Sequence, residues 1–374
     1  MDTILTKITV SNTLTFLFVG LCLVFPMGLL SLTVGPNRWV AQLSELYKWS
    51  DTTQSSLQKV AIVIFLILVL WATIKVTQYL DNKFNYNRKQ KRIVWGILSV
   101  GLLVSVYIFS FQPEVLTAIN VTDSVDKSDT AEYHFGPYPD ADKLQQLKAE
   151  NYDGVISLLH PLVVPAEPIL MDKEKANAAK AEIKLISVPM LPWISKNDSS
   201  VVAIRKMARE LKGKYYVHCY LGKDRANVFK NIIRKETGHT VKGVANSERS
   251  LELQQKFERG TIYKLENEVY LTPCPTDEEM LAFILNGKVN SVVSLLNPEE
   301  EGDAKILGTE KLLMNRYNQF YANHPIHRKM SDEEILQKIK TIKTYRKPMV
   351  IHAFFTDNST AKRFRELYAK DMTP

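Results

Sequence analysis

Three long apolar segments in the first 111 residues constrain this chain more than any other feature. They cover about residues 13–35, 60–79 and 93–111, and the first and third contain no charged side chain. A helix needs about 20 predominantly apolar residues to cross the hydrocarbon core of a bilayer. We therefore expect a transmembrane region with three spans over residues 1–111, surrounded by a lipid bilayer.

Basic residues are concentrated between the second and third segments. Residues 83–92 contain five Lys and Arg, whereas residues 112–132 contain only Lys127. Short loops rich in Lys and Arg usually face the cytoplasm. This bias predicts a multi-pass protein, as in a bacterial inner membrane, with everything after residue 111 on the periplasmic side.

The composition of the whole chain narrows the partners. Its 48 Lys and Arg exceed its 40 Asp and Glu, which favours anionic partners such as phosphates or lipid head groups. No Lys/Arg-rich arm lies outside the membrane-flanking run, so we do not expect a nucleic-acid partner. Three cysteines are too few for a disulfide scaffold.

The remaining two thirds of the sequence contain an internal repeat. Residues 133–161 and 269–298 both contain Pro-x-Pro, an amphipathic helical pattern and an apolar strand that ends in Ser-Leu-Leu-x-Pro. Residues 214–233 and 347–367 both contain an apolar run, a histidine, a short loop and a helical pattern. Such self-similarity indicates a duplicated domain. The predicted order is a linker over 112–132, a domain over 133–246, a linking helix over 247–260 and a second domain over 261–374.

Strands and helices are expected to alternate within the first copy. This alternation indicates an α/β fold with a central sheet flanked by helices. The predicted strands are 154–159, 184–190 and 215–218, and the predicted helices are about 173–182, 199–212 and 225–235.

The loop His-Cys-Tyr-Leu-Gly-Lys-Asp-Arg over 218–225 carries the clearest chemistry. It joins an expected strand to an expected helix, so it lies at a helix N-terminus that favours anions. Gly222 permits a tight turn, and the planar guanidinium of Arg225 matches phosphate oxygens. In this positive environment the pKa of Cys219 is expected to fall, which would make it a thiolate nucleophile.

A Cys-x5-Arg sequence preceded by His, with Gly three residues after Cys, resembles the signature loop of cysteine-dependent protein tyrosine and dual-specificity phosphatases. The resemblance covers about residues 133–236. It implies that Cys219 forms a cysteinyl-phosphate without a metal or other cofactor. It also implies that Arg225 and the backbone amides of the loop hold the phosphate oxygens, and that His218 orients the loop. The remaining phosphate-binding residues would be Tyr220, Leu221, Gly222 and Lys223.

Two departures from this family concern turnover. Ala226 stands where the family usually has Ser or Thr, and the stretch about 30 residues before Cys219 lacks the usual acidic residue. Asp224 is our first candidate for the proton donor, and Asp198 is the alternative. Asp224 could instead be a structural carboxylate paired with Arg225, and Asp198 could instead cap a helix.

The second copy lacks the nucleophile and the arginine. It reads His-Ala-Phe-Phe-Thr-Asp-Asn-Ser, so Ala353 replaces the cysteine and Ser359 replaces the arginine. We expect a pseudophosphatase domain that packs on the first domain or binds a protein of a membrane complex. Cys274 aligns with Tyr138 rather than with Cys219, and we assign it no chemistry.

Two functions remain open. The first is a membrane-anchored phosphatase that hydrolyses a lipid, glycan or protein phosphomonoester. The second is a catalytically weak or inactive module that serves as a binding or scaffold subunit. A channel or transporter is disfavoured because Lys75 is the only ionisable residue within the three apolar segments that bears a full charge at neutral pH.

Overall fold

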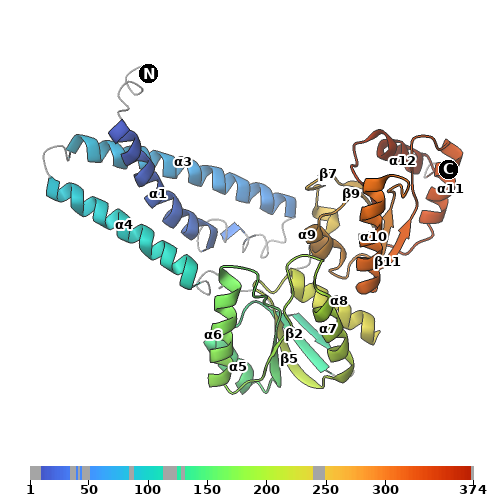
Figure 1. Cartoon of the computed structure of the whole chain (residues 1–374), viewed down its shortest axis with the longest axis horizontal. Coiled ribbons are helices and arrows are strands. Elements are labelled where there is room, and N and C mark those ends of the chain that lie inside the picture. Colours follow the sequence, from blue (N-terminus) through green and yellow to red (C-terminus); the bar gives the residue numbers. More distant parts are fainter. Residues whose placement is uncertain are drawn as a thin grey trace. The chain divides into compact units, whose positions relative to one another are not determined.

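The computed structural model describes residues 10–33, 39–40, 43, 51–83, 88–112, 124–127, 131–238 and 249–371. The chain divides into two compact units, 1–118 and 119–374 (Figure 1). The end of the first predicted domain, at residue 246, lies outside the described residues.

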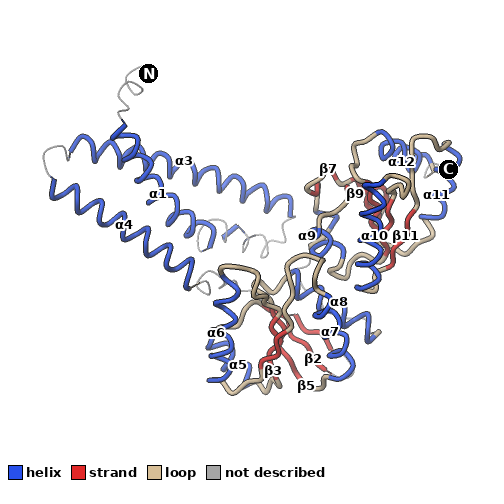
Figure 2. The backbone as a smooth tube through the Cα atoms, in the orientation of Figure 1, coloured by secondary structure: helices blue, strands red, loops and turns tan. Residues whose placement is uncertain are grey.

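The first unit contains a helix at each of the three predicted apolar segments (Figure 2). Two stretches, Ser56–Leu80 and Arg92–Phe111, are long and apolar enough to cross a membrane, and Thr15–Gly28 is a shorter apolar helical stretch. Large apolar side chains on these helices are exposed; Ile97 and Leu103 are each 67% exposed. The helices are α1 (Val10–Thr33), α3 (Asp51–Lys83) and α4 (Arg88–Phe111).

Residues 119–238 of the second unit are called the first half below, and residues 249–374 the second half. The first half is built on a five-stranded sheet with the order β1-β2-β5-β3-β4. Only β1 runs antiparallel to its neighbour, and the other pairs are parallel. The carboxyl ends of β2 to β5 therefore meet at one edge, where α/β folds bind ligands. The strands are β1 (Ser124–Lys127), β2 (Ala131–Gly136), β3 (Gly154–Ser157), β4 (Leu185–Ser187) and β5 (Gly213–His218).

Helices cover both faces of this sheet, as the sequence predicts (Figure 1). Leu144 and Leu147 of α5 pack on Val155 and Tyr216 on one face. The buried residues of α7 and α8 pack on the opposite face, against a cluster that includes Val217. The helices are α5 (Ala141–Ala149), α6 (Ala166–Lys180), α7 (Asp198–Glu210) and α8 (Asp224–Thr237).

The second half has its own five-stranded sheet, with the order β11-β10-β12-β9-β8. Read from the other end, this order and its strand directions are the same as in the first sheet. The strands are β8 (Tyr263–Glu266), β9 (Val269–Pro273), β10 (Ser291–Ser294), β11 (Phe320–Asn323) and β12 (Met349–Ala353). The helices are α9 (Asp277–Glu279) with the π-helical turn η3 (Met280–Ile284), α10 (Glu301–Arg316), α11 (Asp332–Ile342) and α12 (Ser359–Lys370).

The two halves share one apolar core. Ile204 and Ile232 from the first half belong to the same buried cluster as Phe283 and Met314 from the second. Polar contacts reinforce this packing. For example, Asn231 Nδ2 donates to the carbonyl oxygen of Leu285 at 2.9 Å. Burial of apolar side chains is the main source of stability at such a contact.

One prediction about the connecting segments is wrong, and the other falls mostly outside the described residues. The expected linking helix over 247–260 is instead a single 3-10 turn, η2 (Leu251–Leu253), followed by the two-stranded pair β6 (Lys256–Phe257) and β7 (Gly260–Thr261). Backbone pairing across the Glu258–Arg259 turn replaces helical hydrogen bonds there. The expected linker over 112–132 lies mostly outside the described residues; its described part includes β1, because a polar segment can form an edge strand that needs only one partner.

Candidate functional site

The signature loop lies at the carboxyl edge of the first sheet. It leaves β5 after His218 and enters α8 at Asp224, with Lys223 at the N-cap position. The first turn of a helix exposes backbone N–H groups that favour an anion. The predicted strand, loop and helix around residues 218–225 are therefore confirmed as elements.

Gly222 allows this loop to pack closely against the end of β2. Its φ is +67°, and an added Cβ would lie 2.3 Å from the carbonyl carbon of Gly136. The loop is also attached to this strand end through the backbone, because Tyr138 N donates to Tyr220 O at 3.3 Å. A side chain at position 222 would force the loop away from the sheet.

Arg225 is buried and held by fixed acceptors. Its Nη1 donates to the carbonyl oxygens of Leu158 at 3.1 Å and Met190 at 3.0 Å, and to Glu167 Oε2 at 3.0 Å. Its Nη2 donates to the other carboxylate oxygen of Glu167. Apart from an interaction with Cys219, these bonds leave the Nε and Nη2 edge of the guanidinium, which has the shape to hold two oxygens of a phosphate.

Cys219 lies beside this arginine. The pKa of Arg225 is raised: burial lowers it, but the hydrogen bonds and ion pair with Glu167 and the neighbouring Cys219 outweigh that effect. Cys219 is 3% exposed and belongs to the buried cluster that also contains Ala226. The structure therefore brings the predicted nucleophile and the predicted anion-binding side chain together.

His218 anchors the base of the loop. Its Nε2 lies 2.6 Å from Glu174 Oε1, and Ser157 Oγ donates to Glu174 Oε2 at 2.8 Å. The Tyr138 ring packs edge-on against the imidazole at 5.9 Å between centroids. This buried network fixes the orientation of the strand end that carries Cys219.

The sequence analysis missed both buried glutamates of α6. Glu167 and Glu174 are seven residues apart, so they lie on the same side of the helix, and both are buried. Acidic side chains are seldom buried without partners. The partners here are Arg225 and His218, which are 58 and 44 residues away. A sequence signal exists in the two-turn spacing of the acids beside Leu170 and Ala178.

His160 is a second residue that the sequence analysis did not assign. Its backbone N donates to Glu167 Oε2 at 2.7 Å, the oxygen that also accepts from Arg225. Its Nδ1 accepts from Leu162 N at 3.1 Å, which places the proton of a neutral imidazole on Nε2. The pKa of His160 is lowered overall. Burial is the main cause, and the charge of Arg225 also lowers it, whereas the charge of Glu167 raises it by less than burial lowers it.

The two candidate proton donors are both engaged in ion pairs. Asp224 Oδ1 and Oδ2 accept from Arg249 Nε and Nη2 at 3.0 and 3.1 Å. The sequence left open a structural pair between Asp224 and Arg225, but Arg225 pairs with Glu167 instead. Asp198 is the first residue of α7 and pairs with Arg316 of α10; the N-cap is Asn197. Asp224 follows the loop directly, whereas Asp198 lies on a contact between the halves.

The other predicted loop residues differ in exposure. Leu221 is 37% exposed, and Lys223 and Tyr220 are partly buried. The pKa of Tyr220 is raised by burial and by the charge of Glu167, so its phenol stays protonated near neutral pH. The backbone amides and the Lys223 side chain are the groups with which this loop could contact an anion.

The corresponding edge of the second sheet is hollow. A cavity of about 720 Å³ is lined by Ala353 at the end of β12, by Phe354 and by the first residues of α12. Asn297, Asp303 and Arg328 contribute the opposite wall. The replacement of the cysteine and arginine by Ala353 and Ser359 leaves this cavity without the predicted nucleophile.

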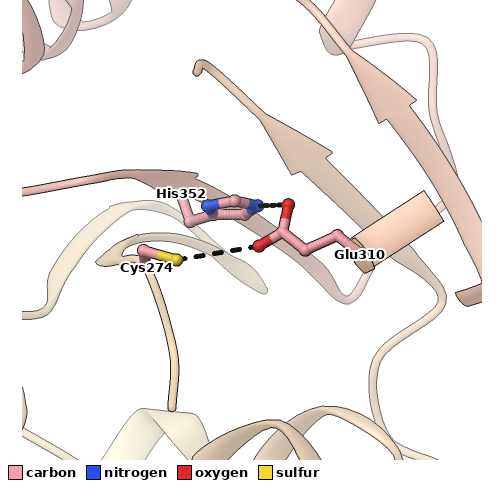
Figure 3. Close-up of side chains that lie close together, drawn as sticks. All are labelled: Cys274, Glu310 and His352. Atoms are coloured by element: carbon pink, nitrogen blue, oxygen red, sulfur yellow. Dashed lines mark hydrogen bonds and ion pairs between the residues drawn. The ribbon is translucent and has the colours of Figure 1, made fainter. Parts of the chain in front are cut away.

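One buried cluster has side chains that metals bind. Cys274, Glu310 and His352 each offer one ligand atom, and these atoms lie within 4.8 Å of one another (Figure 3). Cys274 follows β9, Glu310 is on α10 and His352 is on β12. No role was assigned to this cysteine from the sequence, because the contact with Glu310 and His352 depends on three separate elements.

Comparisons with known proteins give one distant likeness. No family model matches the chain, and no curated protein matches it. Two crystal structures of the protein described as "Putative phosphatase (DUF442)" from Shewanella putrefaciens CN-32 are similar to part of it. The first has 17% sequence identity and a TM-score of 0.27, and covers 37% of this chain and 83% of that one. The second has 16% identity and a TM-score of 0.26, and covers 34% and 76%.

Proposed function

We propose that this chain is a cysteine-dependent phosphatase that hydrolyses a phosphomonoester. The observation that carries the proposal is the loop between β5 and α8, which begins at Cys219 and ends at the guanidinium of Arg225, held by Glu167 at the N-terminus of α8. A thiolate, a guanidinium and free helix amides together bind and attack a phosphoryl group.

The proposed reaction has two steps. Cys219 Sγ attacks phosphorus, the bond from phosphorus to the ester oxygen breaks, and Asp224 gives that oxygen a proton. A water molecule then attacks phosphorus and gives a proton to the Asp224 carboxylate, the sulfur–phosphorus bond breaks, and the thiolate returns with inorganic phosphate as product. Arg225 Nε and Nη2 and the loop amides hold the phosphoryl oxygens in both steps.

Two features of the first half shape this proposal. Glu167 fixes the guanidinium plane before substrate binds, so little side-chain freedom is lost on binding. Asp224 is paired with Arg249. For Asp224 to act as the acid, this ion pair must open, or the carboxyl group must take up a proton while the pair is in place. Asp198 is the alternative acid, and its pair with Arg316 imposes the same requirement.

A second candidate function is a binding module without turnover. The cavity of about 720 Å³ in the second half favours it, since that cavity could hold part of a partner without a nucleophile. In this alternative the first loop binds an anion, and residues 261–374 recognise a protein of a membrane complex. Ala226, in place of a hydroxyl residue, agrees with slow breakdown of an intermediate.

We further propose that the two halves arose by duplication, with the second half a pseudophosphatase. The identical strand order and directions support this relationship. In this proposal the α7 and α8 side of the first copy packs on the η3 and α10 side of the second.

We also propose that α1, α3 and α4 anchor the chain in a bacterial inner membrane, with the α/β halves in the periplasm. The exposed apolar surfaces of α3 and α4 support membrane insertion. Labelling of intact cells with a membrane-impermeant maleimide tests the orientation. A cysteine at exposed Val202 should react, and one at Lys89 should react only after permeabilisation. The reverse pattern would place the halves in the cytoplasm.

The phosphatase proposal is tested with the full-length chain in detergent. Phosphate release from an aryl phosphate should be lost on Cys219→Ser and retained on Cys274→Ser, the same chemical change in the second half. Equal phosphate release by the wild type and by Cys219→Ser would overturn the phosphatase proposal. Retained phosphate binding without release would favour the binding module.

A further inference from the structure

Cys274, Glu310 and His352 converge below the carboxyl edge of the second sheet. Cys274 Sγ lies 3.7 Å from Glu310 Oε1, and His352 Nε2 lies 3.4 Å from Glu310 Oε2 (Figure 3). All three side chains are buried, and His352 is fully so. They come from the end of β9, from α10 and from β12, so the fold holds them in place.

This cluster contains polar atoms that protein hydrogen bonds do not satisfy. Among the described residues, His352 Nδ1 and Thr272 Oγ1 are buried without a hydrogen-bond partner, and His352 Nε2 makes no hydrogen bond beyond its 3.4 Å ion pair with Glu310. Thr272 and His352 face each other in the β9–β12 register. Buried polar groups almost always have partners, so several unsatisfied atoms in one place indicate a missing ligand.

The first half shows what a satisfied version looks like. There His218 and Glu174 are 2.6 Å apart, and Ser157 bonds to the same carboxylate. The Tyr138 ring fills the space beside His218. Cys274 occupies the position of Tyr138 in the second half, and its histidine–glutamate distance has widened to 3.4 Å. A bulky aromatic has thus been exchanged for a metal-binding thiol.

The distances fit tetrahedral metal coordination. Bonds of about 2.0–2.3 Å from zinc to nitrogen, oxygen and sulfur place neighbouring ligand atoms roughly 3.3–3.8 Å apart. Cys274 Sγ to Glu310 Oε1, at 3.7 Å, and His352 Nε2 to Glu310 Oε2, at 3.4 Å, lie in this range, and one ligand atom from each residue lies within 4.8 Å of the other two. Tyr321 Oη donates to Glu310 Oε2 at 2.8 Å, the kind of outer contact that orients a carboxylate ligand.

We propose that Cys274, Glu310 and His352 bind a zinc ion, with a water molecule beside Thr272 in the fourth position. Binding forms bonds from zinc to sulfur, nitrogen and oxygen, and the thiol proton is released to solvent. Because the site is buried and joins a strand end, a helix and the central strand, the ion stabilises the second half. It takes no part in the reaction proposed for Cys219.

Cobalt(II) is the probe, because its spectrum reports sulfur coordination directly. The full-length chain in detergent is treated with a chelator and titrated with cobalt. We expect one ion per chain, a thiolate-to-cobalt charge-transfer band in the near ultraviolet and visible bands of tetrahedral intensity. One equivalent of zinc should remove these bands.

Variants locate the site. Cys274→Ser should lose the charge-transfer band, and Cys219→Ser should keep it. Cys274→Tyr, which introduces the residue of the first half, should also lose it while circular dichroism shows a folded chain. No charge-transfer band in wild type, or a band that survives Cys274→Ser, would overturn the proposal. Because this readout is independent of phosphate release, it stands or falls separately from the phosphatase proposal.

Discussion

The two α/β halves have the same strand order and different side chains at the carboxyl edge of the sheet. In both, a carboxylate near the start of a helix accepts from the backbone of the loop after the second parallel strand. Glu167 accepts from His160 N at 2.7 Å, and Asp303 accepts from Asn297 N at 2.9 Å. Only the first half adds the arginine that this carboxylate orients. The carboxylate-to-backbone contact is therefore present in both halves, with and without the arginine.

The same comparison can be made for the buried histidine on the middle strand of each sheet, His218 on β5 and His352 on β12. His218 is held by Glu174 at hydrogen-bond distance, whereas His352 lies 3.4 Å from Glu310 and beside Cys274. The comparison teaches that a buried histidine–carboxylate pair at the same place in two sheets can have different neighbours, a Tyr138 ring in one half and the Cys274 thiol in the other.

The largest difference between the halves should come from the arginine. Arg225→Lys keeps the charge beside Glu167 but loses the planar fork, so kcat/KM for an aryl phosphate should fall about a hundredfold or more. Ser359→Ala, the aligned position in the second half, should change nothing. An Arg225→Lys enzyme with wild-type kcat/KM and unchanged thermal stability would contradict the role given to the guanidinium.

The next effect concerns the proton donor. Asp224→Asn should lower turnover of a phosphate ester with a poor leaving group by about a hundredfold, and affect a good leaving group less. Asp198→Asn should have a small effect on both substrates, because its carboxylate pairs with Arg316. Measurement of kcat across a series of leaving groups distinguishes the two, and the opposite result would assign the acid to Asp198.

A smaller effect is expected from the glycine that seats the loop. Position 222 has a left-handed backbone conformation and no room for a Cβ atom. Gly222→Ala should therefore lower the free energy of unfolding by about 1–3 kcal/mol and lower the activity. Gly308→Ala, on an open helical position of α10, should be neutral or stabilising by up to about 1 kcal/mol. Thermal unfolding of both variants gives the comparison. Equal midpoints would show that the loop tolerates the side chain.

The smallest effect tests the contact between the halves. Lys235 Nζ donates to Gln319 Oε1 at 2.8 Å, and burial together with the charge of Arg205 lowers its pKa to about 8. Between that pH and the unfolded pKa of about 10.4, the unfolded chain binds a proton that the folded chain lacks, so stability should rise with pH. The stability of wild type relative to Lys235→Met should therefore increase from pH 7.5 to pH 10. A constant difference would show that the ammonium is not desolvated.

Local patterns predicted the elements around the site well. The conformation of the strand, loop and helix over 215–235 is determined mainly by residues close together in the sequence. The structure has these elements as β5, the loop after it and α8. The linking helix over 247–260 was wrong because Lys256–Phe257 pairs with Gly260–Thr261, an interaction that helical composition does not reveal.

The buried carboxylates could not be predicted by the same reasoning. Glu167 and Glu174 belong to a helix whose start was expected near residue 173, and its first turn begins at Ala166. Their burial is tolerable because Arg225 and His218 reach them from another part of the chain. Sequence spacing alone does not identify such partners, nor the meeting of Cys274 with Glu310 and His352.

The most direct test of the central claim is to trap the intermediate. The full-length chain is mixed with an aryl phosphate and quenched in acid within the first turnover, and its peptides are analysed by mass spectrometry. A phosphoryl group on Cys219, with none on Cys274, is the predicted result. Phosphate release without any adduct on Cys219 would contradict the account.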